Sequence, residues 1–300
     1  MTVMDRIPAQ ASADDGGRAR PVRAELAELL KLSGPVVIAR LGIMAMGLSD
    51  AIVVGRYSAT QLGYHALGWA PTSVVVTMAI GLLAGVQVMT ARAIGEGRRH
   101  ETGAVLRRGL GYGLAIGVGS AAVLAVLGPI LLHVIGLERS LADGATAPLR
   151  VFCLSLPVYA LSTTASVWLE GLSKPGPAAW MMWIANAINL GLDLLLVPGT
   201  FGLPALGAVG GAWATTGART FLAVGMLGYI ALMPEARALG VFAKPPRDRA
   251  AEAEQRRIGF GAGASNFCEV AAFASLNIIA GWLGGLAIAA WTIVLNVAAI

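Results

Sequence analysis

Long apolar segments alternate with short polar ones along most of the chain. No Asp, Glu, Lys or Arg occurs in the segments 66–91, 109–137, 151–169, 194–218 and 270–300. About 20 apolar residues in a helix span the hydrocarbon core of a bilayer. With glycine, proline and charge clusters as boundaries, the pattern predicts helices over 32–55, 66–91, 108–135, 149–171, 178–197, 206–233, 258–282 and 287–300. We therefore expect an all-α polytopic membrane protein.

The composition supports this interpretation. Of the 300 residues, 56 % are hydrophobic and only 13 % are charged, and the mean hydropathy is +0.71. A soluble domain carries about 25 % charged residues. The first 24 residues are polar and contain no apolar stretch, so the first membrane helix, not a cleaved signal peptide, is expected to direct insertion. Disordered, fibrous and disulfide-scaffold proteins are excluded.

The basic residues indicate the orientation of the helices. A net charge of +5 could point to nucleic acid, but 17 of the 22 Lys and Arg lie in the N-terminal segment and in every second connection. Only three lie at the other side, and Arg40 and Arg219 lie within helices. Positive loops stay in the cytoplasm. We expect a cytoplasmic N-terminus in a bacterial cytoplasmic (inner) membrane and no nucleic-acid partner.

One connection divides the chain. The segment 234–257 carries ten charged residues and the sequence Lys244-Pro-Pro. It separates a cytoplasmic tail (1–25) and a six-helix lobe (26–233) from the start of a second lobe (258–300). After an even number of helices the second lobe begins on the same side, as in a parallel repeat about the membrane normal. The last apolar run, 287–300, gives about 21 Å of helix, so we expect either a fragment or a natural truncation.

Polar side chains inside the apolar segments are the first candidates for function, because a charge in hydrocarbon costs at least ~2.5 kcal/mol. Asp50 lies in the first helix, and Asn186, Asn189 and Asp193 share one face of the fifth. Asp50 could instead lie at the outer interface, and the polar stripe could simply join helices. Two carboxylates with amide oxygens form a set of hard ligands that suits a proton or a small cation.

The sixth and seventh helices add three further groups. Thr215 and Arg219 are one turn apart, and Glu269 lies near the middle of its helix. We expect Arg219 to neutralise a carboxylate or to reach the cytoplasmic interface. Glu269 is either a site residue or a packing partner of Arg40, and Arg40 could equally extend to the interface.

Soluble-type catalysis finds no support in the sequence. The three histidines, His65, His100 and His133, lie in loops or alone at helix ends, and no phosphate-binding GxxxxGK[ST] motif occurs. We expect neither an enzyme nor a cofactor.

Several segments together resemble a known family. They are Gly34–Arg56, Gln87–Gly97, Glu170–Pro175, Asn189–Asp193, Leu206–Thr215 and the glycine-rich start of the seventh helix with Glu269. Their order and spacing resemble the multidrug and toxic compound extrusion (MATE) family, in its bacterial NorM-like branch. The resemblance implies about twelve helices in two lobes. It also implies export of cationic or amphipathic compounds in exchange for Na⁺ or H⁺.

The resemblance also assigns roles to residues. Asp50 resembles the essential carboxylate of the N-terminal lobe. The residues Asn189, Asp193 and Thr215 resemble its cation-site partners. Together these four residues would bind Na⁺ in a sodium-coupled transporter. Glu269 resembles the acidic residue of the second lobe, and Asn186, Arg219 and Arg40 are supporting candidates. Asp193 is typical of a related branch and Glu269 of the NorM-like one, so the coupling ion stays open.

Two other functions are less compatible with the residues. A flippase for lipid-linked precursors or polysaccharides would be expected to have more basic residues in its cavity than Arg40 and Arg219. A lipid-modifying membrane enzyme would need His, Asp or Ser grouped at the interface, and no such group is seen. The expected partners are the bilayer and small cationic or amphipathic compounds, and we expect a monomer.

Overall fold

The computed structural model describes residues 22–134, 139–243 and 248–282. These residues form seven α-helices and one 3-10 turn, η1 (Arg99–Glu101). The helices are α1 (Val22–Tyr57), α2 (Ala59–Gly95), α3 (Thr102–Val134), α4 (Arg139–Gly171), α5 (Gly176–Leu196), α6 (Ala208–Leu232) and α7 (Arg249–Trp282). By length and composition, α1 to α5 can each cross a membrane. The all-α prediction is confirmed.

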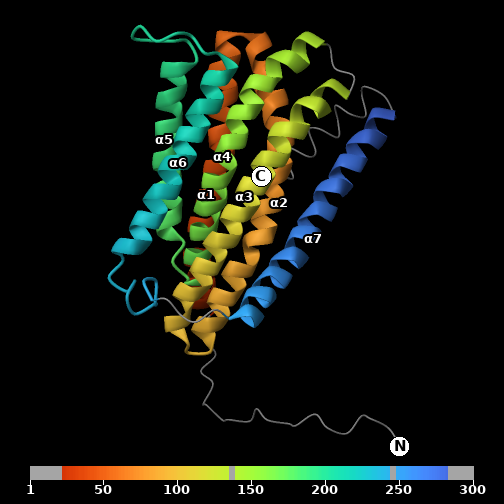
Figure 1. Cartoon of the computed structure of the whole chain (residues 1–300). Coiled ribbons are helices and arrows are strands. Elements are labelled where there is room, and N and C mark those ends of the chain that lie inside the picture. Colours follow the sequence, from red (N-terminus) through yellow and green to blue (C-terminus); the bar gives the residue numbers. More distant parts are fainter. Residues whose placement is uncertain (1–21, 135–138, 244–247, 283–300) are drawn as a thin grey trace, which may run out of the picture.

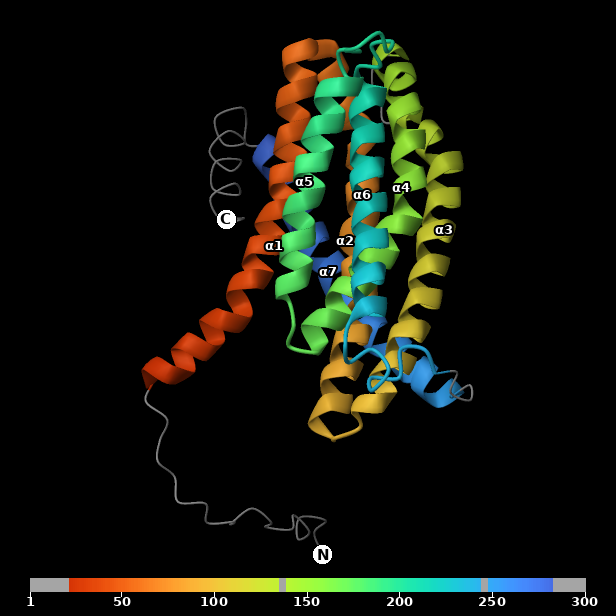
Figure 2. The ribbon, with the colours of Figure 1, turned by 90° about the vertical axis from the view of Figure 1, so that its left-hand side faces the viewer.

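Helices α1 to α6 form an up-and-down bundle (Figure 1). Helix α4 packs against α2, α3 and α6, and α5 packs against α1 and α6. Figure 2 shows α6 running alongside α4 and α5 over its whole length. The turns after α2 and α4, the end of α6 and the start of α7 lie together at the lower end of Figure 1. We call this the basic end, because the arginine-rich connections gather there.

Five helices, α1, α2, α3, α4 and α7, begin six to ten residues earlier than the apolar pattern predicts. Two of these starts have a capping side chain. Helix α2 starts at Ala59, not near 66, because the side chain of Ser58 accepts a hydrogen bond from the backbone N–H of Gln61 (3.4 Å). Ser-x-x-Gln has the spacing of a helix-capping box. Helix α7 starts at Arg249, not near 258, and the Asp248 side chain accepts from the Ala251 N–H (3.0 Å). The last nine residues of the expected linker are therefore helical.

Two expected segments lie outside the described residues. The final helix over 287–300 is one, and most of the N-terminal tail, up to residue 21, is the other.

Helix α7 packs closely along α2 at the basic end. A Cβ on Gly81 would lie 2.6 Å from the Cα of Gly263. A Cβ on Gly259 would collide with the carbonyl oxygen of Leu82. Small residues allow two membrane helices to approach this closely. An ion pair between Arg92 and Glu254 (2.9 Å) continues the contact at the surface.

Candidate cation-binding site

Three helices bring polar side chains together inside the half of the lobe away from the basic end. Asp50 of α1 is 4 % exposed, and Thr215 of α6 is also buried. The Thr215 hydroxyl donates a hydrogen bond to Oδ2 of Asp50 (2.7 Å). Asp50 is thus held inside the lobe, and the alternative position at the outer interface is wrong.

Helix α5 adds an acid and an amide that are fully buried. Asn189 and Asp193 lie about one turn apart, and the Asp193 carboxylate is close enough to interact with Asp50. By distance and angle, however, neither oxygen of Asp193 has a hydrogen-bond partner among the described residues, and the same holds for the amide of Asn189 and for Oδ1 of Asp50. Buried polar atoms without partners are rare and costly, so this cluster can accept a proton or a small cation.

The donor set fits an oxygen-binding cation better than a transition metal. No group of three or more His, Cys, Asp or Glu with metal-binding geometry occurs in the described part of the chain. The unsatisfied atoms include carboxylate and amide oxygens, which are ligands for hard cations.

His65 of α2 is a neighbour of this cluster that the sequence reasoning missed. Its Nε2 lies 3.8 Å from Oδ2 of Asp50, and its Nδ1 lies 3.5 Å from the carbonyl oxygen of Ala208. The ring of Phe152 packs edge-on against it at 5.2 Å. The expectation that His65 lies in a loop or alone at a helix end is wrong, because α2 begins six residues before it and its ring lies beside Asp50. The capping signal of Ser58 could have placed it within the helix.

Asn186 plays a different part from Asn189. Its side-chain nitrogen donates to the backbone carbonyls of Gly42 (2.9 Å) and Met182 (2.9 Å), which joins α5 to α1. Gly42 is required here, since a Cβ would lie 2.5 Å from Cγ of Met182. The helix-joining interpretation therefore applies to Asn186.

Arg219 is enclosed within the lobe. It is 6 % exposed and donates from Nη1 to the hydroxyl of Ser155 (2.7 Å). Its guanidinium lies over the rings of Trp69 (4.9 Å) and Tyr159 (4.8 Å). It forms no ion pair within 4 Å among the described residues, although its charge interacts with Asp50 at longer range. The expectation that Arg219 reaches the interface is wrong.

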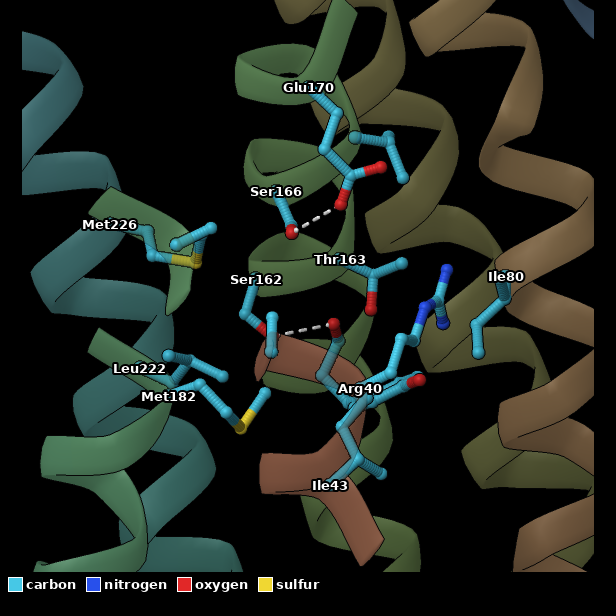
Figure 3. A pocket seen from close by; sticks show the side chains of 14 residues that line it. Arg40, Ile43, Ile80, Ser162, Thr163, Ser166, Glu170, Met182, Leu222 and Met226 are labelled. Carbon is cyan, nitrogen blue, oxygen red and sulfur yellow. Dashed lines mark hydrogen bonds between the residues drawn. The ribbon is translucent and has the colours of Figure 1, made fainter. Parts of the chain in front are cut away.

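A separate cavity of about 50 Å³ lies closer to the basic end (Figure 3). Arg40 enters it from α1, and the hydroxyls of Ser162, Thr163 and Ser166 line it from α4. Ser166 (3.2 Å) and Gln87 (3.2 Å) both donate hydrogen bonds to the carboxylate of Glu170. Methionine and leucine side chains from α5 and α6 complete the wall: Met182, Leu222 and Met226.

The remaining candidate, Glu269, lies within α7, but its side chain is outside the described part of the structure. Its pairing with Arg40 therefore stays a prediction. The charge of Arg40 does interact with Glu170 of α4.

Comparisons with known proteins agree with the fold. The MatE family model matches residues 35–195. The chain is 62 % identical to a probable multidrug resistance protein NorM of Caulobacter vibrioides, over the whole chain and 64 % of that protein. It is 31 % identical to the multidrug resistance protein PmpM of Pseudomonas aeruginosa, over 93 % of the chain and 59 % of that protein. The chain thus spans about three-fifths of the length of these relatives.

A solved structure has the same arrangement of helices. The crystal structure of a MATE protein in the bent conformation superposes with a TM-score of 0.80 at 21 % identity, covering 88 % of this chain and 58 % of that one.

Proposed function

The chain belongs to the MatE family of membrane transporters, and we propose that it forms the cation-coupled part of an antiporter that exports cationic or amphipathic compounds. The relatives that it matches are named as multidrug resistance proteins. No enzymatic step is part of this proposal. The N-terminus lies in the cytoplasm, since the basic end then faces the cytoplasm as the distribution of arginines requires.

One observation carries the proposal. Asp50, Asn189, Asp193 and Thr215 come from three helices and meet in one buried cluster. Apart from Oδ2 of Asp50, its carboxylate and amide atoms are left without hydrogen-bond partners among the described residues. A merely structural polar contact would satisfy these atoms. A site that must take up and release an ion leaves them free for the ion.

The coupling follows from the proximity of two acids. Two carboxylates in a poorly hydrated interior resist being ionised together, so a shared proton or a bound Na⁺ relieves their repulsion. Because Asp50 is on α1 and Asp193 on α5, filling the site draws these helices together. An ion that binds one arrangement of the lobes better than the other shifts the equilibrium between them. Exchange then needs only that the exported compound favours the opposite arrangement.

The cavity of Figure 3 is the place we assign to the exported compound within this lobe. Its apolar wall of methionine and leucine side chains suits the apolar part of such a compound, and the carboxylate of Glu170 suits a positively charged group on it. Its volume of about 50 Å³ is smaller than that of the usual small-molecule site, so the exported compound has to widen the cavity when it binds. It is distinct from the Asp50 cluster, so ion and compound can bind in turn.

The α2–α7 contact supports alternating access. Backbone-to-backbone packing at the glycines holds α7, the first helix of the second lobe, against α2 at the basic end. A contact of this kind that forms and separates in turn would open and close the path on that side.

The test is transport by the complete gene product in proteoliposomes. A fluorescent organic cation is loaded, and a Na⁺ gradient and a pH gradient are imposed separately. Transport that follows one gradient identifies the coupling ion. Equal rates with and without either gradient would contradict coupled exchange.

A further inference from the structure

An arginine-lined groove lies between α3 and α7 at the basic end. Arg107, Arg108 and Tyr112 of α3 line it on one side, and Glu252, Gln255 and Arg256 of α7 line it on the other. The groove has a volume of about 460 Å³ and is open to the outside. Gln255 holds the two helices together, because its side-chain nitrogen donates to the Val105 carbonyl oxygen (3.4 Å).

The two arginines of α3 lack acidic partners. Arg107 donates from Nη1 to the carbonyl oxygen of Val241 (3.3 Å), and Arg108 donates from Nε to Oε1 of Gln255 (3.3 Å). Neither has a carboxylate within 4 Å among the described residues. Nη2 of Arg107 is buried without any hydrogen-bond partner. Arg107 is thus held by a backbone carbonyl oxygen and Arg108 by an amide oxygen, and neither of these neutral acceptors cancels the positive charge.

Two other arginines at the same end are already neutralised. Arg92 pairs with Glu96 and Glu254, and Arg98 pairs with Glu96 and Glu101. The groove itself gathers three arginines, Arg107, Arg108 and Arg256, against one carboxylate, that of Glu252, so its net charge is positive.

The depth of the groove fits the headgroup layer of a membrane. Helix α3 exposes apolar side chains from Leu114 (43 %) to Val134 (77 %), with Val118 (52 %) one turn after Leu114. These 21 residues give about 30 Å of helix, the thickness of the hydrocarbon core. Arg107 and Arg108 lie about two turns beyond its edge, from where their long side chains can reach toward the headgroups. Tyr112 lies at the edge, where tyrosine is enriched.

We propose that this groove binds the phosphate headgroup of an anionic phospholipid of the cytoplasmic leaflet. Arg107 and Arg108 contact the phosphate, Arg256 closes the groove from α7, and the acyl chains lie along Leu114 and Val118. Basic pockets between membrane helices on the cytoplasmic side are suited to such headgroups. A free phosphate would use the arginines but not the apolar surface below them. Because the lipid contacts both α3 and α7, it strengthens the contact between the two lobes.

Native mass spectrometry of the purified gene product tests the site without any transport assay. Phosphatidylglycerol is titrated into the wild type, and phosphatidylcholine and inorganic phosphate are titrated separately. We expect phosphatidylglycerol to bind, with an affinity that falls as salt rises, and the other two to bind weakly. Equal binding of phosphatidylcholine would overturn the proposal. Displacement of the lipid by millimolar phosphate would assign the groove to free phosphate and overturn it as well.

Variants locate the binding within the structure. Replacing both arginines (R107Q/R108Q) should weaken phosphatidylglycerol binding about thirtyfold, from the usual contribution of a basic residue near an anionic lipid. The control R99Q/R237Q removes two exposed charges at the same end, outside the groove, and should leave the affinity unchanged. R107K/R108K keeps the charge and should retain most of the affinity. Unchanged affinity in R107Q/R108Q, or an equal loss in the control, would refute the site.

Discussion

Replacing Asp50 by Asn separates the charge of the proposed coupling site from its shape. The Thr215 hydroxyl, which donates to Oδ2 of Asp50 over 2.7 Å, can donate to the amide oxygen of Asn in the same place. The side-chain volume is nearly unchanged. What disappears is the negative charge that faces Asp193 and interacts at longer range with Arg219.

The effect on stability is expected to be small because two changes oppose each other. A hydrogen bond to a charged acceptor is worth about 1 kcal/mol more than a neutral one, and this is lost. The repulsion between the carboxylates of Asp50 and Asp193 is lost too, which stabilises the fold. We expect the unfolding free energy to change by less than about 1 kcal/mol, or a few degrees in Tm.

Coupled export should instead be abolished, because an amide cannot bind and release the proton or cation at neutral pH. The assay is efflux of an organic cation from proteoliposomes under the gradient that drives the wild type. Asp143→Asn is the matched control: it makes the same replacement at an exposed carboxylate, which pairs with His133 (2.9 Å) at the surface, outside the Asp50 cluster. Export by the Asp50→Asn protein at the wild-type rate would refute the coupling role of Asp50.

Three further predictions follow from contacts elsewhere. Thr215→Val removes the donor to Asp50 and should weaken binding of the coupling ion about tenfold, measured by titration of the ion in the purified protein. Gly259→Ala should destabilise the α2–α7 contact by about 1–3 kcal/mol in a thermal melt, whereas Gly261→Ala, where a Cβ meets nothing within 4 Å, should not. The hydrogen bond from Lys174 (2.7 Å) holds the pKa of Glu235 below its ordinary value of 4.5, so its stabilisation is present above about pH 4.5 and lost as pH falls through the lower, folded-state value. The difference in Tm between wild type and Glu235→Gln should therefore shrink on acidification, and a constant difference would contradict this.

The apolar pattern predicted the helices because membrane spans are dictated by length and composition. It placed their ends less well. The first turns of α2 and α7 are polar, and they are set by local capping at Ser58 and Asp248, not by hydrophobicity. Both capping residues are visible in the sequence, so these two boundaries were open to prediction.

The contacts between helices were harder to predict. The i, i+3, i+7 spacing places Asn186, Asn189 and Asp193 on one face, but it does not distinguish Asn186, which joins α5 to α1, from Asn189, which lies in the cluster. That difference depends on the close approach of α1 to α5, which the missing side chain of Gly42 allows. The position of His65 beside Asp50 likewise depends on the rotation of α2 relative to α1, which no periodicity within a single helix determines.

The way in which Arg219 is held has a consequence for the neighbouring acids. A guanidinium paired directly with Asp50 would neutralise it permanently, and the site would have no use for a mobile cation. Arg219 is instead bound by a neutral hydroxyl and by the faces of Trp69 and Tyr159, which stabilise a buried cation without a carboxylate. Its charge then acts on Asp50 only at longer range. We therefore expect that arrangement to lower the affinity of the proposed site for a cation without abolishing it, as an ion that is released in every cycle would need.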